Sequence, residues 1–127
     1  MTYKFGTYGG THVLHVDECG PAITSELDGR ELLERAIQED AQWIAIPASR
    51  LGDAFFTLSS GLAGAIVQRL QNHGCGLAVL GDVERHAAAS TSFGALLAES
   101  NRTGGRGNLL FAADAADLRR RLQARGA

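Results

Sequence analysis

Trp43-Ile-Ala-Ile46 and Gly76-Leu-Ala-Val-Leu80 are the two stretches that decide the fold. Each is a short continuous apolar run followed by Pro or Gly, a pattern typical of strands buried on both faces of a sheet. Between them, apolar residues recur at helical spacing, which predicts a helix over about residues 58–73, with Gly74 at its left-handed C-terminal position. A strand, a helix and a second strand in this order predict a parallel pair joined by a right-handed crossover.

The sequence outside this unit predicts further elements of the same kind. Two β-prone runs at 3–8 and 11–16 flank Gly9-Gly10, a pair that supplies the positive φ angles of a tight hairpin. Asp28-Gly-Arg-Glu31 has the form of a capping box and opens a predicted helix over 29–40. Three more elements are predicted toward the C-terminus: a helix capped by Ser90 or Ser92 and ending near Asn101, a strand over 109–111, and a helix over 114–125.

The predicted order of elements is therefore β-β-α-β-α-β-α-β-α, in a single domain of residues 1–127. Strands that alternate with helices pair in parallel, because each helix returns the chain to the same edge of the sheet. We expect an α/β domain with a mixed, mainly parallel sheet of about five strands. The glycine-rich stretch Thr103-Gly-Gly-Arg-Gly107 is predicted to be a loop.

Composition excludes several classes of function. The chain has 127 residues, 45% hydrophobic and 20% charged, with a formal net charge of −2, which argues against a general nucleic-acid binder. The cluster Arg119-Arg-Arg121 and Arg125 lies beside Asp114 and Asp117 and is interpreted as a solvated helix end. The sequence has no apolar run of roughly 20 residues and no signal-peptide core at its start, so we expect a soluble cytoplasmic protein.

One candidate site lies at the carboxyl ends of the predicted parallel strands, where ligands bind in open α/β sheets. This rim is expected to hold Ser49, Arg50, Asp53, Ser59, Ser60, Gly61 and Asp82. A helix that opens with Ser59-Ser60-Gly61 offers hydroxyl and backbone donors to an anion, and Arg50 is a candidate clamp. The alternative is that these serines only cap their helix.

A second candidate corner lies at the opposite rim, where the predicted helices end. It is expected to hold Glu99, Ser100, Asn101 and Arg102, together with Glu39, Asp40 and His73. Four adjacent polar residues of different type could form a site. The alternative is structural, since Asn at a helix C-cap and Arg near the C-terminal end of the helix dipole are common stabilising devices.

No set of His, Cys and carboxylate residues in the sequence has the spacing of a metal site or a catalytic triad. His12 and His15 face opposite sides of their predicted strand, and Cys19 and Cys75 fit no CxxC pattern. We therefore expect no metal and no cofactor. A separate pair, Gly61 and Gly64, is interpreted as letting the second helix approach the sheet closely.

The middle of the chain resembles a known family. The stretches Asp53-Ala-Phe-Phe-Thr-Leu-Ser-Ser-Gly-Leu-Ala-Gly-Ala-Ile-Val-Gln-Arg-Leu70, Leu77-Ala-Val-Leu-Gly-Asp82 and Glu99-Ser-Asn101 are similar, in order and distance, to motifs of the bacterial family of domains of unknown function numbered 4180. The resemblance covers roughly residues 10–122 and implies no known activity. Carried over residue by residue, it implies a site at Asp53, Phe55, Phe56, Ser59, Ser60, Gly61, Glu99, Ser100 and Asn101.

The element order and the turn Leu58-Ser-Ser-Gly-Leu62 also resemble STAS domains, named for sulfate transporters and anti-sigma-factor antagonists. In the antagonists a similar turn opens the second helix and carries a serine that a partner kinase phosphorylates, and by position this serine is Ser60. A phosphate at a helix N-terminus is stabilised locally and changes the surface that a partner meets. The Asp that precedes the serines in those proteins is Leu58 here.

The leading expectation is a non-enzymatic, cytoplasmic STAS-like domain that binds a protein partner or a small anionic ligand in a regulatory role. Two alternatives stay open. One is a small enzyme that uses Asp53 or Asp82 as acid or base while Arg50 orients an anionic substrate. The other is a switch phosphorylated at Ser59 or Ser60. We expect no nucleic-acid or membrane partner, and an exposed edge strand near the N-terminal hairpin makes a homodimer reasonable.

Overall fold

The computed structural model describes the chain at residues 3–8, 10–17, 23, 25–51, 53–56, 61–83, 88, 93–95, 97–98 and 109–126. Its elements in chain order are β1 Tyr3–Tyr8, β2 Thr11–Val16, α1 Glu26–Gln38, β3 Trp43–Pro47, the 3-10 turn η1 Ala48–Arg50, α2 Asp53–Phe56, α3 Leu62–Asn72, β4 Gly76–Leu80, β5 Leu109–Ala112 and α6 Ala115–Gly126. Over these described ranges, no helix has the length and apolar character needed to cross a membrane.

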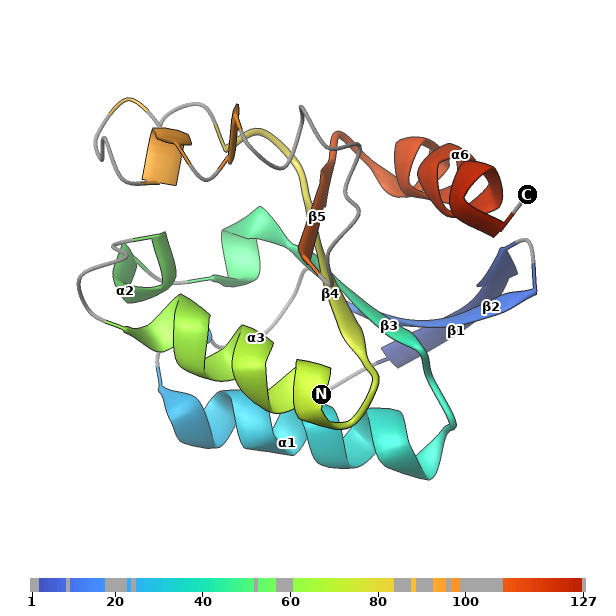
Figure 1. Ribbon diagram of the computed structural model, residues 1–127, viewed down its shortest axis with the longest axis horizontal. Helices are drawn as coiled ribbons and strands as arrows, with labels where there is room; N and C mark the ends of the chain where they lie inside the picture. Colours follow the sequence, from blue (N-terminus) through green and yellow to red (C-terminus); the bar gives the residue numbers. More distant parts are fainter. Residues whose placement is uncertain are drawn as a thin grey trace.

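The five strands form one sheet in the order β1-β2-β3-β4-β5 (Figure 1). β1 and β2 are antiparallel, as the hairpin prediction requires, and Gly10 in the turn has a φ of +84°. The pairs β2–β3, β3–β4 and β4–β5 are parallel. The predictions of an α/β fold and of a mixed, mainly parallel sheet are confirmed.

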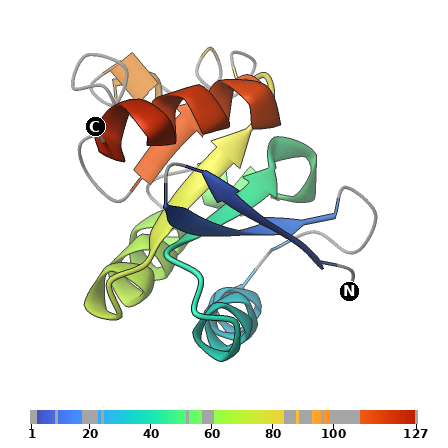
Figure 2. The same cartoon turned by 90° about the vertical axis from the view of Figure 1, so that its right-hand side faces the viewer.

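Helices cover both faces of this sheet, and Figure 2 shows α6 on one side with α1 and α3 on the other. On the α1 and α3 side, strand residues such as Leu14, Ile44 and Leu77 are fully buried. On the α6 side, Leu118 and Leu122 pack with a smaller cluster contributed by the strands: Val13, Trp43, Ala45, Ala78, Leu110 and Ala112. Because successive strand residues face opposite sides, the continuous apolar runs are buried on both faces.

Helix α1 begins earlier than the sequence predicted. Its N-cap is Ser25, whose hydroxyl accepts the backbone N–H of Asp28, while the Asp28 carboxylate accepts the backbone N–H of Ser25. The prediction that Asp28 opens a capping box with Glu31 is wrong, because Ser25 satisfies the same motif about one turn upstream. The helix ends at Gln38 rather than at Asp40, whose φ of +54° lies outside the right-handed helical region.

Helix α3 begins at Leu62, so the predicted start near residue 58 is wrong. Its N-cap is Gly61, which has a φ of +78° and provides no capping side chain. A residue in this left-handed conformation cannot continue a right-handed helix, which is why the helix starts after it. The other end agrees with the prediction, because His73 is the C-cap and Gly74 has a φ of +71°.

The element predicted between β4 and β5 is only partly described. Residues 93–95 and 97–98 are helical, in agreement with the predicted third helix, whereas its proposed caps Ser90 and Ser92 and its end at Asn101 lie outside the described residues. The glycine-rich stretch 103–107 lies outside them as well. The strand and helix that follow, β5 and α6, are present as predicted.

Close packing depends on Gly29 and Gly76 rather than on Gly61 and Gly64. A Cβ added at Gly61 or Gly64 would meet no atom within 4 Å, so the prediction that this pair lets the helix approach the sheet is wrong. A Cβ at Gly29 would lie 2.7 Å from Cγ1 of Ile66, so this glycine lets α1 and α3 pack together. At Gly76 the space is filled by an indole ring of the neighbouring strand.

Candidate functional site

The rim predicted at the carboxyl ends of the strands is described only in part. Asp82 is the second residue after β4 and is exposed. Asp53 begins α2, but its side chain lies outside the described residues. Ser59 and Ser60 lie outside them entirely, so their proposed capping, anion-binding and phosphorylation roles stay predictions.

The structure places Arg50 beneath the rim. Arg50 is 1% exposed, and its Nη1 donates a hydrogen bond of 2.5 Å to the backbone carbonyl of Asp17. The Arg50 carbonyl in turn accepts the N–H of Ile23 at 2.6 Å. Arg50 therefore connects the turn after β3 to the chain that leaves β2. The hypothesis that it clamps an anion stays a prediction, and such an anion would have to reach a buried guanidinium.

Phe55 and Phe56 belong to an aromatic cluster inside the core. Their rings meet edge to face at 5.4 Å between centroids. Phe56 contacts Phe93 at 5.2 Å, and Phe93 contacts Phe111 at 5.7 Å, both in the same T-shaped arrangement. This chain of rings packs α2 against the segment around Phe93 and against β5. The two residues thus support the carboxyl-end rim from within, and neither is more than 2% exposed.

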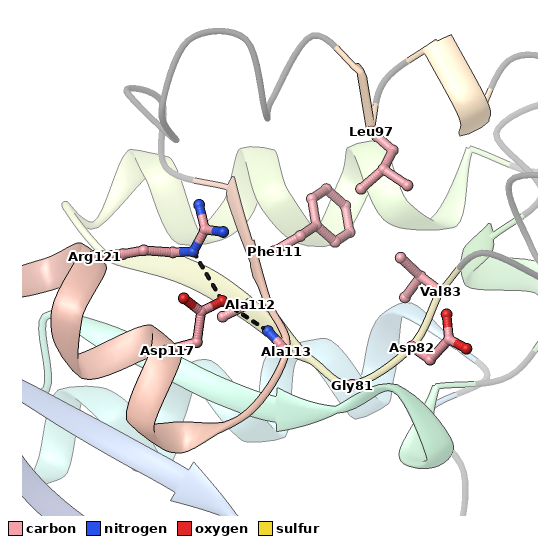
Figure 3. A pocket seen from close by; sticks show the side chains of 9 residues that line it. All are labelled: Gly81, Asp82, Val83, Leu97, Phe111, Ala112, Ala113, Asp117 and Arg121. Atoms are coloured by element: carbon pink, nitrogen blue, oxygen red, sulfur yellow. Dashed lines mark hydrogen bonds and ion pairs between the residues drawn. The ribbon is translucent and has the colours of Figure 1, made fainter.

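An open hollow of about 430 Å³ lies at the carboxyl ends of β4 and β5, beside α6 (Figure 3). We call it the β4–β5 hollow. Its lining consists of Gly81, Asp82, Val83, Leu97, Phe111, Ala112, Ala113, Asp117 and Arg121. Apolar side chains form the floor, with Asp82 at one end and Arg121 at the other. The position matches the rule that ligands bind outside the carboxyl ends of strands in open α/β sheets.

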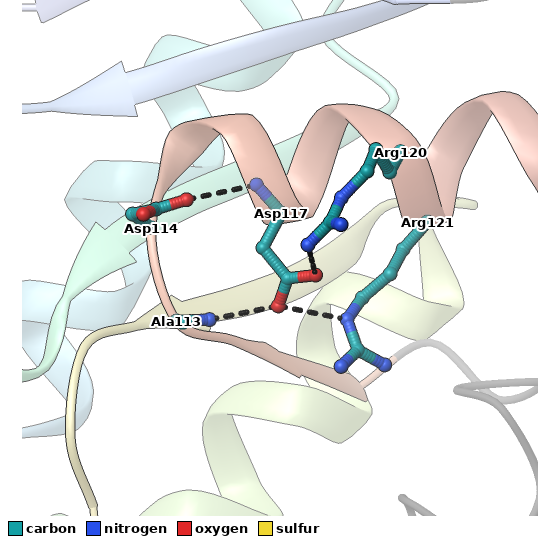
Figure 4. Close-up of polar contacts among 5 residues, drawn as sticks. All are labelled: Ala113, Asp114, Asp117, Arg120 and Arg121. Carbon is teal, nitrogen blue, oxygen red and sulfur yellow. Dashed lines mark hydrogen bonds and ion pairs between the residues drawn. The ribbon is translucent and has the colours of Figure 1, made fainter.

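Asp117 organises the polar end of the hollow (Figure 4). Its carboxylate accepts the backbone N–H of Ala113 at 3.0 Å, Nε of Arg121 at 3.1 Å and Nη2 of Arg120 at 2.8 Å. The hydrogen bond from Ala113 is the main cause that holds the pKa of Asp117 below its ordinary value; burial opposes this, and the two guanidinium groups add to the lowering. Asp114 caps α6 by accepting the N–H of Asp117 at 2.8 Å.

Sequence reasoning missed Asp117 and Arg121 as site residues and interpreted them as part of a solvated helix end. The sequence did contain a signal for this pair: Asp117 lies four residues before Arg121 in the predicted helix, the spacing at which a carboxylate and an arginine form an ion pair. The structure distinguishes the arginines: the Arg120 side chain is 77% exposed, whereas that of Arg121 is 36% exposed and lines the hollow. What this arrangement can do chemically is present a fixed guanidinium beside an apolar floor.

A second pocket, of about 380 Å³, lies near the ends of α1 and α3 at the opposite rim. It brings Asp40 and His73 together, as the sequence had placed them. Glu39 lies near Arg35, with 3.9 Å between the charged groups. The remaining members of that predicted corner, Glu99, Ser100, Asn101 and Arg102, lie outside the described residues.

Cys75 also lines this second pocket. It is 4% exposed, its thiol lies 3.6 Å from the carbonyl oxygen of Gly76, and burial raises its pKa to about 11. A thiol that stays protonated at neutral pH is a poor nucleophile. Within the described part of the chain, no group of three or more His, Cys, Asp or Glu side chains is arranged to hold a metal ion.

Fold and site together define an α/β domain with one mixed five-stranded sheet and a hollow at the carboxyl edge of that sheet. A family model with the description "Domain of unknown function (DUF4180)" matches residues 8–122, and the chain belongs to this family. The resemblance based on the motifs in residues 53–101 is thereby confirmed. No curated protein and no solved structure matches the chain.

Proposed function

We propose that the protein is a non-catalytic binding domain that recognises a small anionic ligand in the β4–β5 hollow and acts in a regulatory role. The observation that carries the proposal is the hollow itself, in which the guanidinium of Arg121 stands at the edge of an apolar floor. Ligand pockets in proteins combine a mainly apolar lining with a few oriented polar groups, and their volumes start at about 300 Å³.

The hollow favours binding over catalysis. Among its described lining residues, no nucleophilic side chain stands beside a base, which is the arrangement that covalent catalysis needs. Asp82, the candidate acid or base, is exposed rather than enclosed in an apolar environment. A general acid at neutral pH usually needs such an environment to raise its pKa.

A serine switch is a second candidate, supported by one observation at α3. Gly61, the N-cap of the eleven-residue α3, supplies no side chain to the N-terminal backbone groups, and a phosphate on the residue before it in the chain is an anion of the kind that a helix N-terminus stabilises. Incubation with cell extract and ATP, followed by mass spectrometry, tests this candidate. Phosphate on Ser60 that is absent in a Ser60→Ala variant supports it, and repeated absence from the native chain rejects it.

The finer classification is part of the proposal. The order of strands and helices, with α3 starting directly after Gly61, supports a STAS-like fold, and we propose a cytoplasmic protein. β1 is the edge strand of the sheet and Phe5 on it is 54% exposed, which supports a homodimer through this strand. Light scattering coupled to size-exclusion chromatography tests the dimer, and a monomer at all concentrations rejects it.

The binding proposal is tested by NMR titration of the ¹⁵N-labelled chain with a library of small acids. Backbone amides of Val83, Ala112 and Ala113 are the reporters, because these residues line the hollow. Ala113→Trp places a bulky side chain at the hollow and should abolish the shifts, since Ala113 is exposed there. The matched control is Ala116→Trp, an exposed position on α6 outside the lining. Absence of shifts at the reporters with every compound refutes the function.

A further inference from the structure

We infer that the ligand of the β4–β5 hollow is a monocarboxylate with an apolar body, and that the guanidinium of Arg121 binds its carboxylate. This inference rests on the proposed function and specifies the chemistry of the ligand. It depends on four features of the hollow: the orientation of Arg121, the net charge of the cluster that holds it, the Asp82 carboxylate at the opposite end, and the apolar floor between the two ends.

Arg121 is fixed at one nitrogen and leaves its fork accessible. Nε donates to the Asp117 carboxylate, and in Figure 3 the two terminal nitrogens point away from Asp117. Within the described part of the chain, these terminal nitrogens make no hydrogen bond. Two parallel N–H groups of one guanidinium match the two oxygens of a carboxylate, which is the strongest geometry for this pair.

The cluster around Arg121 carries net positive charge. Two arginines share one carboxylate, so Arg120, Arg121 and Asp117 together carry a formal charge of +1. Asp114 caps the start of α6, and Figure 4 shows it on the far side of Asp117 from Arg121. The Asp117 carboxylate is itself held by the backbone N–H of Ala113, so its hydrogen bond to Nε orients the Arg121 guanidinium.

The opposite end of the hollow disfavours a second negative charge on the ligand. The exposed carboxylate of Asp82 lies there, away from Arg121 (Figure 3). A dicarboxylate that spans the hollow would bring its second anionic group toward Asp82, where like charges repel. A phosphate ester carries nearly two negative charges on one group at neutral pH, more than the formal charge of +1 of the arginine cluster balances.

The floor between the two ends selects an apolar body. Val83 and Phe111 are each 6% exposed and Leu97 is 8% exposed, so the core presents a small apolar surface to the hollow. Contact of the ligand with this surface removes apolar area from water on both sides. A carboxylate without an apolar body, such as acetate, would gain only the contact with Arg121.

Four probes with the same eight-carbon chain test the inference by NMR titration and calorimetry on the full chain. They are octanoate, its neutral isostere octanamide, the dicarboxylate octanedioate and octyl phosphate. We expect octanoate to shift the amides of Val83, Ala112 and Ala113 and to bind at least about tenfold more tightly than each of the other three. Octanamide loses the charge on the hydrogen bond to Arg121, and a hydrogen bond to a charged group contributes about 1.5–3 kcal/mol. Octanedioate and octyl phosphate carry the second negative charge that the hollow disfavours.

Substitutions test whether the preference for a monocarboxylate depends on Arg121. Arg121→Gln should weaken octanoate about tenfold or more and leave octanamide unchanged, and Arg121→Lys should recover only part of the loss, since lysine keeps the charge without the fork. Asp117→Asn should weaken octanoate in the same selective way if Asp117 positions Arg121. The matched control is Arg119→Gln, an exposed arginine of α6 outside the lining, which should bind like the native chain.

The outcomes show separately whether the inferred ligand class is wrong and whether the proposed binding function is wrong. Equal binding of octanoate and octanamide, or tightest binding of octanedioate or octyl phosphate, overturns the monocarboxylate while the binding function stands. The same holds if octanoate fails but another library compound shifts the reporters. If no compound shifts them, both the function and the inference are overturned. The comparison of probes on the native chain decides this even if a variant fails to fold.

Discussion

The substitution Gly76→Ala tests how the sheet packs on the α6 side. Gly76 in β4 is the registered neighbour of Trp43 in β3. A Cβ at this position would lie 2.7 Å from Cε3 and 2.8 Å from Cδ2 and Cε2 of the indole. Trp43 is 9% exposed and belongs to the cluster under α6, so its ring has little room to move away.

The magnitude follows from these distances. Carbon atoms in ordinary contact are about 3.5–4.0 Å apart, so the ring would have to move by about 1 Å. Overpacking of this kind costs about 1–3 kcal/mol. Alanine recovers about 0.5–1 kcal/mol relative to glycine in a strand, because it has less backbone freedom to lose on folding. The expected net effect is a loss of about 1–1.5 kcal/mol in the free energy of unfolding.

Urea unfolding followed by tryptophan fluorescence is the assay, because Trp43 is the single tryptophan of the chain. With a urea slope of about 1.5 kcal/mol per M, the midpoint should fall by about 1 M, and the native emission should change with the ring position. Gly64→Ala is the matched control. A Cβ there meets nothing within 4 Å on an exposed helical position, so the same substitution should stabilise by about 0.5–1 kcal/mol.

A second variant separates the clash from a general defect of the strand. In the presence of Trp43→Leu, Gly76→Ala should cost much less than alone, because the smaller side chain leaves room for the new methyl group. The difference is the interaction free energy of a double-mutant cycle. Far-UV circular dichroism follows unfolding in all four variants of this comparison, since Trp43→Leu removes the single tryptophan. The reasoning is refuted if Gly76→Ala keeps both the native midpoint and the native emission, or if the cost is unchanged without the indole.

Three further predictions concern buried or hydrogen-bonded side chains. Arg50→Met should lower the free energy of unfolding by about 2 kcal/mol in urea titrations, because the buried hydrogen bond to the Asp17 carbonyl is lost; an unchanged midpoint would contradict this. Native Cys75 should react slowly with iodoacetamide at pH 8, as peptide mass spectrometry can measure. Burial raises the pKa of the Cys75 thiol from its ordinary value of 9.0 to about 11, so the free energy of unfolding should fall as pH rises from 9 to 11. Cys75→Ala should remove that part of the decline. The pKa of Asp117 is lowered in the folded state, so its contribution to the free energy of unfolding is present above the ordinary pKa of 3.8 and is lost as pH falls below that value. Asp117→Asn should therefore reduce the loss of stability with falling pH in that range. An unchanged dependence of stability on acid pH would argue against the contacts drawn in Figure 4.

The strands were predictable because their signals are local. The runs at 43–46 and 76–80 form strands that are largely buried, and a short continuous apolar run bounded by Pro or Gly is typical of a strand covered on both faces. The start of α1 was not predictable from the sequence, because Ser25 and Asp28 each open an equivalent capping pattern. A long-range contact is available to decide between them: Ile23 forms a parallel bridge with Leu51, which holds the chain just before Ser25. Nothing in the local pattern reveals that bridge.

The candidate site was harder to predict than the fold. The carboxyl edge of the sheet was the expected region, and the β4–β5 hollow lies there with Asp82 in its lining. The guanidinium expected at that edge was Arg50, which instead lies in the interior. The one that lines the hollow, Arg121, comes from the last helix. Its position depends on which face of the sheet α6 covers and on the rotation of that helix about its axis, and both are non-local properties.

The rotation of α6 is set by its core residues. Leu118 and Leu122 are 0% and 2% exposed, and both pack on the sheet. Asp117 and Arg121 each precede one of these leucines by a single position, so the pair lies about 100° around the helix from the buried row, on the flank of α6. Seating the leucines therefore also sets the polar pair beside the end of β5, where Ala113 donates its N–H to Asp117. The rotation of α6 about its axis thus determines both the packing of its leucines on the sheet and the orientation of Arg121, the proposed ligand-binding residue.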